Sequence, residues 1–321
     1  MGTSALEFEK PLAEIEKQIE ELRRMAEERE ISVDREIEPL QAKLGTLRKE
    51  IYENLTPVQR VQVARSPRRP FTLDYLRLAF TDWIEVHGDR AFRDDPAIVG
   101  GWARLDGETV MVIGQQRGRD TKENLHRNFG MPHPEGYRKA LRLMKLAEKF
   151  HVPIVTFIDT PGAWAGLGAE ERGQSEAIAR NLLEMSQLKV PIIATVIGEG
   201  GSGGALALSV ADRILMLQNS VCSVITVEGC AAILWKDGKS QEMREKAATA
   251  LKITATDLLE LRVIDEIIPE PEGGAHTNHE VTAAALREVL IRNLDELRRL
   301  KPDKLVRRRR EKFLRMGQFE E

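Results

Sequence analysis

Cysteine is nearly absent from this sequence. The 321 residues contain only Cys222 and Cys230, which form no CxxC pair, and neither His126 nor His133 lies at a metal-ligand spacing from them. Small secreted domains that depend on disulfides are rich in cysteine, and structural zinc sites need clusters of cysteine and histidine. The sequence therefore predicts no disulfide framework and no metal site. A reducing compartment, the cytoplasm, is expected.

Long apolar runs are also missing. No stretch approaches the roughly 18 apolar residues that indicate a membrane span, and Glu7, Glu9 and Lys10 interrupt the N-terminus before a secretory signal could form. Aromatic residues make up 5% of the chain, charged residues make up 31%, and the formal net charge is only −3. This balance indicates a globular protein in water and gives no general attraction for nucleic acid or membrane.

Charge is distributed unevenly along the chain. Residues 1–53 contain nine Lys/Arg and fourteen Asp/Glu, a net charge of −5, whereas residues 301–315 contain eight and two, a net charge of +6. The basic segment includes the consecutive arginines 307–310. Such a run can bind nucleic acid or a membrane surface. More often it is a solvated helix face or pairs with acidic groups, and this second interpretation is favoured.

The first 53 residues carry a helical pattern. Their apolar residues recur at spacings of three and four, the period of an amphipathic helix: Leu12, Ile15, Ile19, Leu22, Val33, Ile37, Leu40, Leu44, Leu47 and Ile51. Two antiparallel helices are predicted, the second with Pro39 in its first turn, where proline is tolerated. The narrow apolar stripe fits either an interaction arm or packing against the rest of the chain. We expect an N-terminal helical arm over residues 1–55 and one larger domain over residues 56–321.

Strand-like and helix-like segments alternate through the larger domain. Residues 108–118 are predicted to form a strand that runs into a glycine-ended loop, and residues 152–160 and 190–199 to form buried strands. Residues 135–150 and 175–188 are predicted to be helices. Alternation of this kind predicts an α/β fold with parallel strands.

Two of these strands begin with similar four-residue sequences. Val152-Pro153-Ile154-Val155 and Val190-Pro191-Ile192-Ile193 lie at a period of 38 residues, and each strand is followed by a glycine-containing loop. The period predicts an α/β spiral of repeated strand and helix units. Two copies are also compatible with any other parallel α/β fold.

The segment VIGEGGSGGALA (196–207) is unusually rich in glycine, with five glycines among the seven residues from Gly198 to Gly204. Its GxGxxG spacing matches the dinucleotide fingerprint, which requires a long helix and an acidic residue about 20 positions further on. Here the helix predicted from Ala205 ends within two turns, before Asp212, and no acid follows the next strand. The loop also lacks the Gly-Lys-Ser/Thr ending of a nucleotide P-loop. Dinucleotide and P-loop functions are therefore disfavoured.

The segment is predicted to be a strand, a glycine loop and then a helix that begins with small residues. This order places N–H groups without an intrahelical partner at the helix N-terminus, where the helix dipole is positive. Such groups can hold an oxygen that becomes negatively charged during a reaction, an oxyanion hole whose donors contribute roughly 3–4 kcal/mol each. We expect Gly203, Gly204 and Ala205 to act in this way, with Gly200, Gly201 and Ser202 in the same ligand-binding loop. The alternative is that the glycines only permit a tight turn and close packing.

The corresponding loop after the preceding strand contains Thr160-Pro161-Gly162-Ala163. Gly162 and Ala163 are expected to form a second wall of the same site. Asp159 at the strand end could act as an acid, although an aspartate in this position more often accepts hydrogen bonds from loop amides. Residues 117–136 hold several arginines and two histidines, a pattern that fits phosphate or partner binding as well as a solvated loop.

At this point the sequence resembles a known family. The segments GQQRGRDTKENLHRNFGMPHPEGYRKALRLM, FIDTPGAWAGLGAEERGQSEAIARNL, TVIGEGGSGGALAL and IIPEPEGGAH are similar to the carboxyltransferase alpha subunit of the bacterial and plastid multisubunit acetyl-CoA carboxylase. The resemblance runs from the N-terminal helices to near residue 300. One departure is that the family usually has Gly-Ala-Tyr-Pro-Gly where this chain has Gly162-Ala163-Trp164-Ala165-Gly166.

The resemblance implies a crotonase-like fold, a spiral of repeated strand-strand-helix units. It also implies transfer of a carboxyl group from N-carboxybiotin, held on a biotin carboxyl carrier protein, to acetyl-CoA. The product is malonyl-CoA for fatty acid synthesis. The implied partners are a zinc-bearing beta subunit that completes the active site in an alpha2beta2 assembly, the carrier protein, and biotin carboxylase.

Two other functions stay open on the residues alone. A free-standing acyl-CoA hydratase or isomerase of the same fold would need a positioned carboxylate, for which Glu199 is the candidate close to the loop. A non-catalytic scaffold of a carboxylase complex would use the helical arm and the basic C-terminal segment instead.

Overall fold

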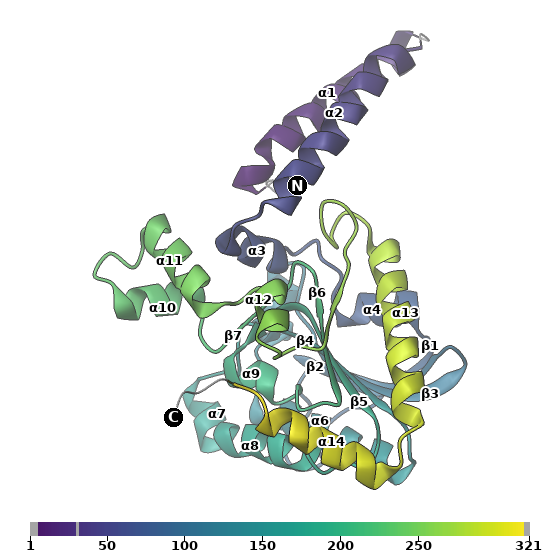
Figure 1. The fold of residues 1–321 in the computed structure, drawn as a ribbon, viewed down its shortest axis with the longest axis vertical. Coiled ribbons are helices and arrows are strands. Elements are labelled where there is room, and N and C mark those ends of the chain that lie inside the picture. Colours follow the sequence, from purple (N-terminus) through teal and green to yellow (C-terminus); the bar gives the residue numbers. More distant parts are fainter. Residues whose placement is uncertain (1–5, 30–31, 318–321) are drawn as a thin grey trace.

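A mixed β-sheet with helices on both faces forms the body of the molecule, and a helical hairpin projects from one end of it (Figure 1). The computed structural model describes residues 6–29 and 32–317. The strands are β1 (Thr81–Glu85), β2 (Ile98–Leu105), β3 (Glu108–Gln115), β4 (Ile154–Thr160), β5 (Ile192–Gly201), β6 (Arg213–Leu217), β7 (Val221–Ser223) and β8 (Glu266–Ile268).

The helices give the molecule its outer layers. In chain order they are η1 (Glu7–Glu9), α1 (Lys10–Arg29), α2 (Asp34–Glu53), α3 (Pro57–Ala64), α4 (Thr72–Ala79), α5 (Thr121–His126), η2 (Asn128–Gly130), α6 (Pro134–Lys149), α7 (Leu167–Glu171), α8 (Gln174–Met185), α9 (Ser202–Leu206), α10 (Val227–Leu234), α11 (Gln241–Leu251), α12 (Ala255–Glu260), α13 (His279–Arg298) and α14 (Pro302–Leu314). Over the residues that the structure describes, none of these helices is long and apolar enough to cross a membrane.

The sheet confirms the α/β class and the predicted buried strands. Its order is β1-β2-β3-β4-β5-β6-β8, with β7 paired to β5. The pairs β1–β2 and β2–β3 are antiparallel, and the pairs from β3 to β8 are parallel. Every residue of β4 is buried, as expected for a parallel strand covered on both faces.

The 38-residue sequence repeat corresponds to the pairing register of two neighbouring strands. β4 and β5 are parallel neighbours, and Ile154 pairs with Ile192 and Val155 with Ile193, so the repeated four-residue sequences lie side by side at their 38-residue period. The register shifts at the carboxyl end, where Thr160 pairs with Gly200. There β5 leaves β6 and pairs with β7, and the glycine loop begins at this bend.

Alternate residues of the strands face two separate cores. On one face Met111, Ile113 and Ile158 belong to the core that contacts α6 and α8. On the other face Val112 and Phe157 belong to the core that contacts α4 and α13. The strands are thus fixed from both sides, which makes their carboxyl ends a rigid base for the loops that follow them.

The N-terminal arm is a helical hairpin that extends away from the sheet (Figure 1). Its apolar stripe is used between the two helices, where Ile15, Ile19 and Ile37 form a small buried core. The prediction for Pro39 is wrong by several residues: α2 begins at Asp34, so Pro39 lies inside the helix and not in its first turn. The division of the chain near residue 55 remains a prediction.

Glu9 fastens the base of the arm. Its carboxylate accepts hydrogen bonds from the Tyr52 hydroxyl at 2.5 Å and the Leu6 N–H at 3.0 Å, and it lies 3.4 Å from His276 of the body. Burial alone would raise the pKa of Glu9, but the hydrogen bonds from His276, Tyr52 and Leu6 lower it from 4.5 to about 2. The ionised form of Glu9 is therefore the form that the folded state stabilises.

Glu9→Gln should make the protein less sensitive to acid. Because the folded-state pKa of Glu9 is depressed to about 2, its contribution to stability is complete above about pH 4.5 and is lost as the pH falls through 2. We expect the free energy of unfolding, measured in urea over this pH range, to fall less steeply in Glu9→Gln than in the wild type. Identical slopes would contradict this assignment.

Candidate active site

The glycine segment forms the end of β5 and the short helix α9. This helix begins at Ser202, three residues before the predicted start at Ala205. The first N–H groups of a helix have no partner within it, and in α9 these belong to Ser202, Gly203 and Gly204. The N–H of Ala205 is the next along α9, and it makes no hydrogen bond to the Gly201 carbonyl of the kind that joins Ala177 to Gly173 at the start of α8. A five-residue helix also differs from the long helix of a dinucleotide fold, in agreement with the sequence analysis.

Two of these glycines allow two backbone segments to approach. A Cβ atom on Gly201 would lie 2.2 Å from the Pro161 carbonyl oxygen, and one on Gly204 would lie 2.6 Å from the Ala163 nitrogen. Close packing, the alternative considered for the sequence, thus accounts for Gly201 and Gly204. It does not account for Gly203, where a Cβ would make only an ordinary contact of 3.5 Å with Ile178.

The same contacts bring the two predicted loops together. Gly204 of α9 packs against the peptide group between Gly162 and Ala163, which follows β4. The N–H of Gly162 donates to the Thr160 hydroxyl at 3.1 Å, and that hydroxyl donates to the Gly162 carbonyl at 2.7 Å. Thr160 therefore fixes the turn and uses the Gly162 N–H, so Ala163 is the better candidate donor of this second wall.

The loop around Trp164 is held by its neighbours although it lacks the proline that the family usually has at residue 165. The Trp164 N–H donates to the Pro132 carbonyl at 3.0 Å. The Gln174 side-chain amide donates to the carbonyls of Trp164 and Pro132, both at 2.8 Å. The indole ring lies 6.0 Å from the ring of His133. These contacts supply a constraint on the backbone that does not depend on proline.

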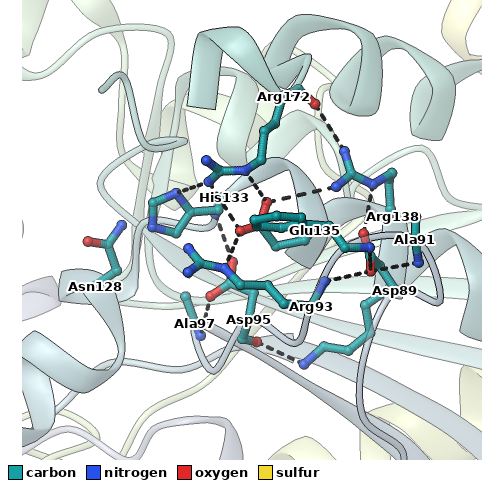
Figure 2. A network of polar contacts seen from close by, with 12 residues as sticks. Asp89, Ala91, Arg93, Asp95, Ala97, Asn128, His133, Glu135, Arg138 and Arg172 are labelled. Carbon is teal, nitrogen blue, oxygen red and sulfur yellow. Dashed lines mark hydrogen bonds and ion pairs between the residues drawn. The ribbon is translucent and has the colours of Figure 1, made fainter. Parts of the chain in front are cut away.

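A buried ionic network supports the segment that carries His133 (Figure 2). Its centre is Glu135, which is fully buried and is bonded by Arg93 at 2.8 Å and Arg172 at 3.1 Å, with Arg138 at 3.8 Å. Burial raises the pKa of Glu135, but the hydrogen bonds from Arg172 and Arg93 outweigh it and leave the pKa below its usual value. The network keeps the start of α6 in place behind the Trp164 loop.

A second buried ionic group lies directly beside the glycines. The Asp159 carboxylate accepts the Glu199 N–H of β5 at 3.1 Å and lies 3.3 Å from Arg117, so it binds a backbone amide, although one in a strand and not in a loop. Burial raises the pKa of Asp159 despite the attraction of Arg117. The Glu199 carboxylate is 6% exposed and is held by Arg65 at 2.6 Å and by Arg117 at 3.5 Å. Neither carboxylate is arranged as a free base.

The predicted backbone donors remain a prediction, and several residues that support their loops give no signal in the sequence. Arg65 lies in α3, far from the loop in sequence, and no local pattern connects it to Glu199. In the basic segment 117–136, Arg119 pairs with Asp74 and donates to the Pro67 carbonyl, while Arg127 donates to the Pro96 carbonyl. Arg119 and Arg127 are therefore engaged within the chain, and phosphate or partner binding by this segment stays a prediction.

Comparison with known proteins places this geometry in a family. A family model described as acetyl co-enzyme A carboxylase carboxyltransferase-like matches residues 5–317. The chain belongs to this family. It is 78% identical over 316 residues to the acetyl-coenzyme A carboxylase carboxyl transferase subunit alpha of Gemmatimonas aurantiaca, covering 98% of each chain. It is 57% identical to the protein of the same name from Thermus thermophilus, covering 98% of this chain and 99% of that one.

Solved structures of other carboxyltransferases share the fold. The transcarboxylase 12S structure aligns with a TM-score of 0.53 at 20% identity, over 71% of this chain and 43% of that one. The beta subunit of Pseudomonas aeruginosa geranyl-CoA carboxylase aligns with a TM-score of 0.54 at 19% identity, over 83% and 47% of the two chains. The predicted crotonase-like fold is confirmed. The predicted family and the carboxyltransferase activity are confirmed as well.

Proposed function

We propose that this chain is the alpha subunit of a multisubunit acetyl-CoA carboxylase and works in the cytoplasm. It would transfer the carboxyl group of N-carboxybiotin, presented by a biotin carboxyl carrier protein, to acetyl-CoA and form malonyl-CoA, the first committed step of fatty acid synthesis. The observation that supports the proposal is that Gly204 of the glycine segment packs against the Gly162–Ala163 peptide group, while both nearby carboxylates are engaged.

The residues of this chain fit a group that gains charge on oxygen. When bound, carboxybiotin would supply the carboxyl group and a ureido nitrogen able to take the methyl proton of acetyl-CoA. The N–H groups of Gly203, Gly204 and Ala205 would hold the ureido oxygen as its negative charge grows. Gly200, Gly201 and Ser202 would line the approach, and Ala163 would close the opposite side. No side chain of this loop needs to act as a base.

The hydratase alternative loses its main candidate group. Glu199 would have to face the substrate with a free carboxylate, yet Arg65 and Arg117 hold both of its oxygens. The site is proposed to be completed by a beta subunit that bears the zinc site and binds the enolate of the thioester. Biotin carboxylase and an alpha2beta2 arrangement belong to the same proposal.

The reverse reaction tests this assignment. With malonyl-CoA and free biotin, we expect no turnover by the chain alone and turnover once a beta subunit is added, because each subunit supplies one set of donors. The measurement is the biotin-dependent formation of acetyl-CoA from malonyl-CoA, followed spectrophotometrically, with the carboxyl group passing to biotin. Thioester chemistry by the lone chain would favour the hydratase function, and an inactive but stable assembly would favour the scaffold.

A further inference from the structure

One buried side chain connects the two walls of the candidate site. Gln115, the last residue of β3, is fully buried. Its Nε2–H donates to the Gly204 carbonyl in α9 at 2.7 Å, and its Oε1 accepts the Asp159 N–H in β4 at 2.9 Å. The Gln115 amide thus links β4, which leads into the Gly162–Ala163 loop, to α9, which carries Gly203 and Gly204.

The position of Gln115 is fixed by the sheet. It follows Met111 and Ile113 at alternate positions of β3, so its side chain lies on the face of the core that both of them join. Its own carbonyl accepts a hydrogen bond from the buried Thr72 hydroxyl at 2.6 Å. Burying an amide in an apolar core costs free energy unless its hydrogen bonds are made. Here both ends of the amide are bonded.

The helix α9 is too short to bond all of its own carbonyls. Most are satisfied by N–H groups just beyond the helix: Ala207 to Gly203, Leu208 to Ala205, and Ser209 to Leu206. The carbonyl of Gly204 instead accepts the Gln115 amide. Because a buried carbonyl needs a partner, the position of α9 depends on a side chain that comes from a different element of the sheet.

We infer that Gln115 is a positioning residue, which sets the distance between the Gly203–Gly204 N–H groups and the Ala163 wall. The inference rests on the function proposed above. Oxyanion donors act only when they are placed close to the oxygen that becomes charged. A displacement of about 1 Å at such a site can lower a rate by roughly 10²-fold. Gln115 touches neither substrate and contributes through the backbone groups that it holds.

The neighbouring residue provides a matched control. Gln116 is 3% exposed and also uses both ends of its amide, accepting the Leu73 N–H at 3.0 Å and donating to the Arg117 carbonyl at 2.8 Å. Gln115→Met and Gln116→Met each replace a buried amide by an apolar chain of similar length. With the beta subunit present, we expect kcat of Gln115→Met to fall roughly 10²-fold and that of Gln116→Met to stay within about threefold, at similar thermal midpoints.

A second variant separates positioning from packing. In Gln115→Glu, a protonated carboxyl can still donate to Gly204 and accept from Asp159, whereas an ionised one can only accept. The kcat of Gln115→Glu relative to the wild type should therefore fall as the pH rises from about 6 to about 9, with burial moving the midpoint upward. The nearby charges of Asp159, Arg117 and Glu199 are paired and are common to both proteins, so the ratio reports the introduced carboxyl.

A selective loss in Gln115→Met together with a pH-dependent ratio in Gln115→Glu supports the inference. Equal losses in the two methionine variants, or a ratio that does not change with pH, overturn it and leave the proposed function standing. An inactive wild-type assembly overturns the proposed function and this inference with it.

Discussion

Gly203→Pro is expected to lower kcat of the reverse reaction at least 100-fold, whereas Gly203→Ala should stay within about threefold of the wild type. Proline removes the N–H at residue 203, and loss of one oxyanion donor typically costs about 10²–10³ in rate. Proline is tolerated in the first turn of a helix, where that N–H makes no intrahelical bond. The measurement is steady-state turnover of malonyl-CoA by the assembled alpha and beta subunits.

Gly203→Ala is the matched control because it adds a side chain and keeps the N–H. Its Cβ would lie 3.5 Å from Ile178, an ordinary contact. Gly204 offers no such control, since a Cβ there would meet the Ala163 nitrogen at 2.6 Å and push the walls apart. Thermal midpoints and size-exclusion profiles check that both Gly203 variants fold and assemble. If the proline variant keeps the rate of the alanine variant, the Gly203 N–H has no part in catalysis.

The sequence was sufficient to predict the core of the fold. β4 and β5 are continuous apolar runs, and their 38-residue period is a direct consequence of the parallel register in which Ile154 meets Ile192. The helices α6 and α8 were found because their apolar residues follow the helical period. Local pattern is reliable here because the strands are buried on both faces and the connections between them are regular.

The candidate site was predicted only in part, because local pattern does not show which segments approach one another. Five glycines indicated a demand on the backbone, but they differ in the structure: Gly201 and Gly204 pack against backbone, Gly203 makes only an ordinary contact, and the other two face side chains. Gln115 gave no signal at all, since a glutamine at a strand end reads as a solvated residue. Its importance arises from contacts with residues 44 and 89 positions away.

The basic C-terminal segment shows the same limit. Four consecutive arginines read as one solvated surface, yet α14 places Leu305 and Arg309 on its inner face, one turn apart. Arg309 is 1% exposed, while Arg307, Arg308 and Arg310 are exposed. The expectation of a solvated or acid-paired face therefore holds for the run as a whole, and one member has a structural role inside the molecule.

Arg309→Met is expected to reduce the free energy of unfolding by about 3–5 kcal/mol, the usual effect of breaking a buried ion pair. The guanidinium bonds both oxygens of the buried Asp212, at 3.0 and 2.6 Å. It also donates to the carbonyls of Met185, Leu188 and Val190, and so fastens α14 to the segment before β5. Without it, the Asp212 carboxylate stays buried with little compensation. Urea unfolding followed by circular dichroism measures the loss.

Two comparisons decide whether the loss comes from this pair. Arg308→Met removes an exposed arginine from the same run and should change stability by less than about 0.5 kcal/mol. Adding Asp212→Asn to Arg309→Met should restore part of the stability, because the uncompensated charge is then gone.

Burial raises the pKa of Asp212 and Arg309 opposes that rise, so removing Arg309 raises the pKa further. A raised folded-state pKa favours the native state at lower pH, and the deficit of Arg309→Met should therefore shrink as the pH falls. A deficit that is equal in the Arg308 and Arg309 variants would show that the buried pair is not its source.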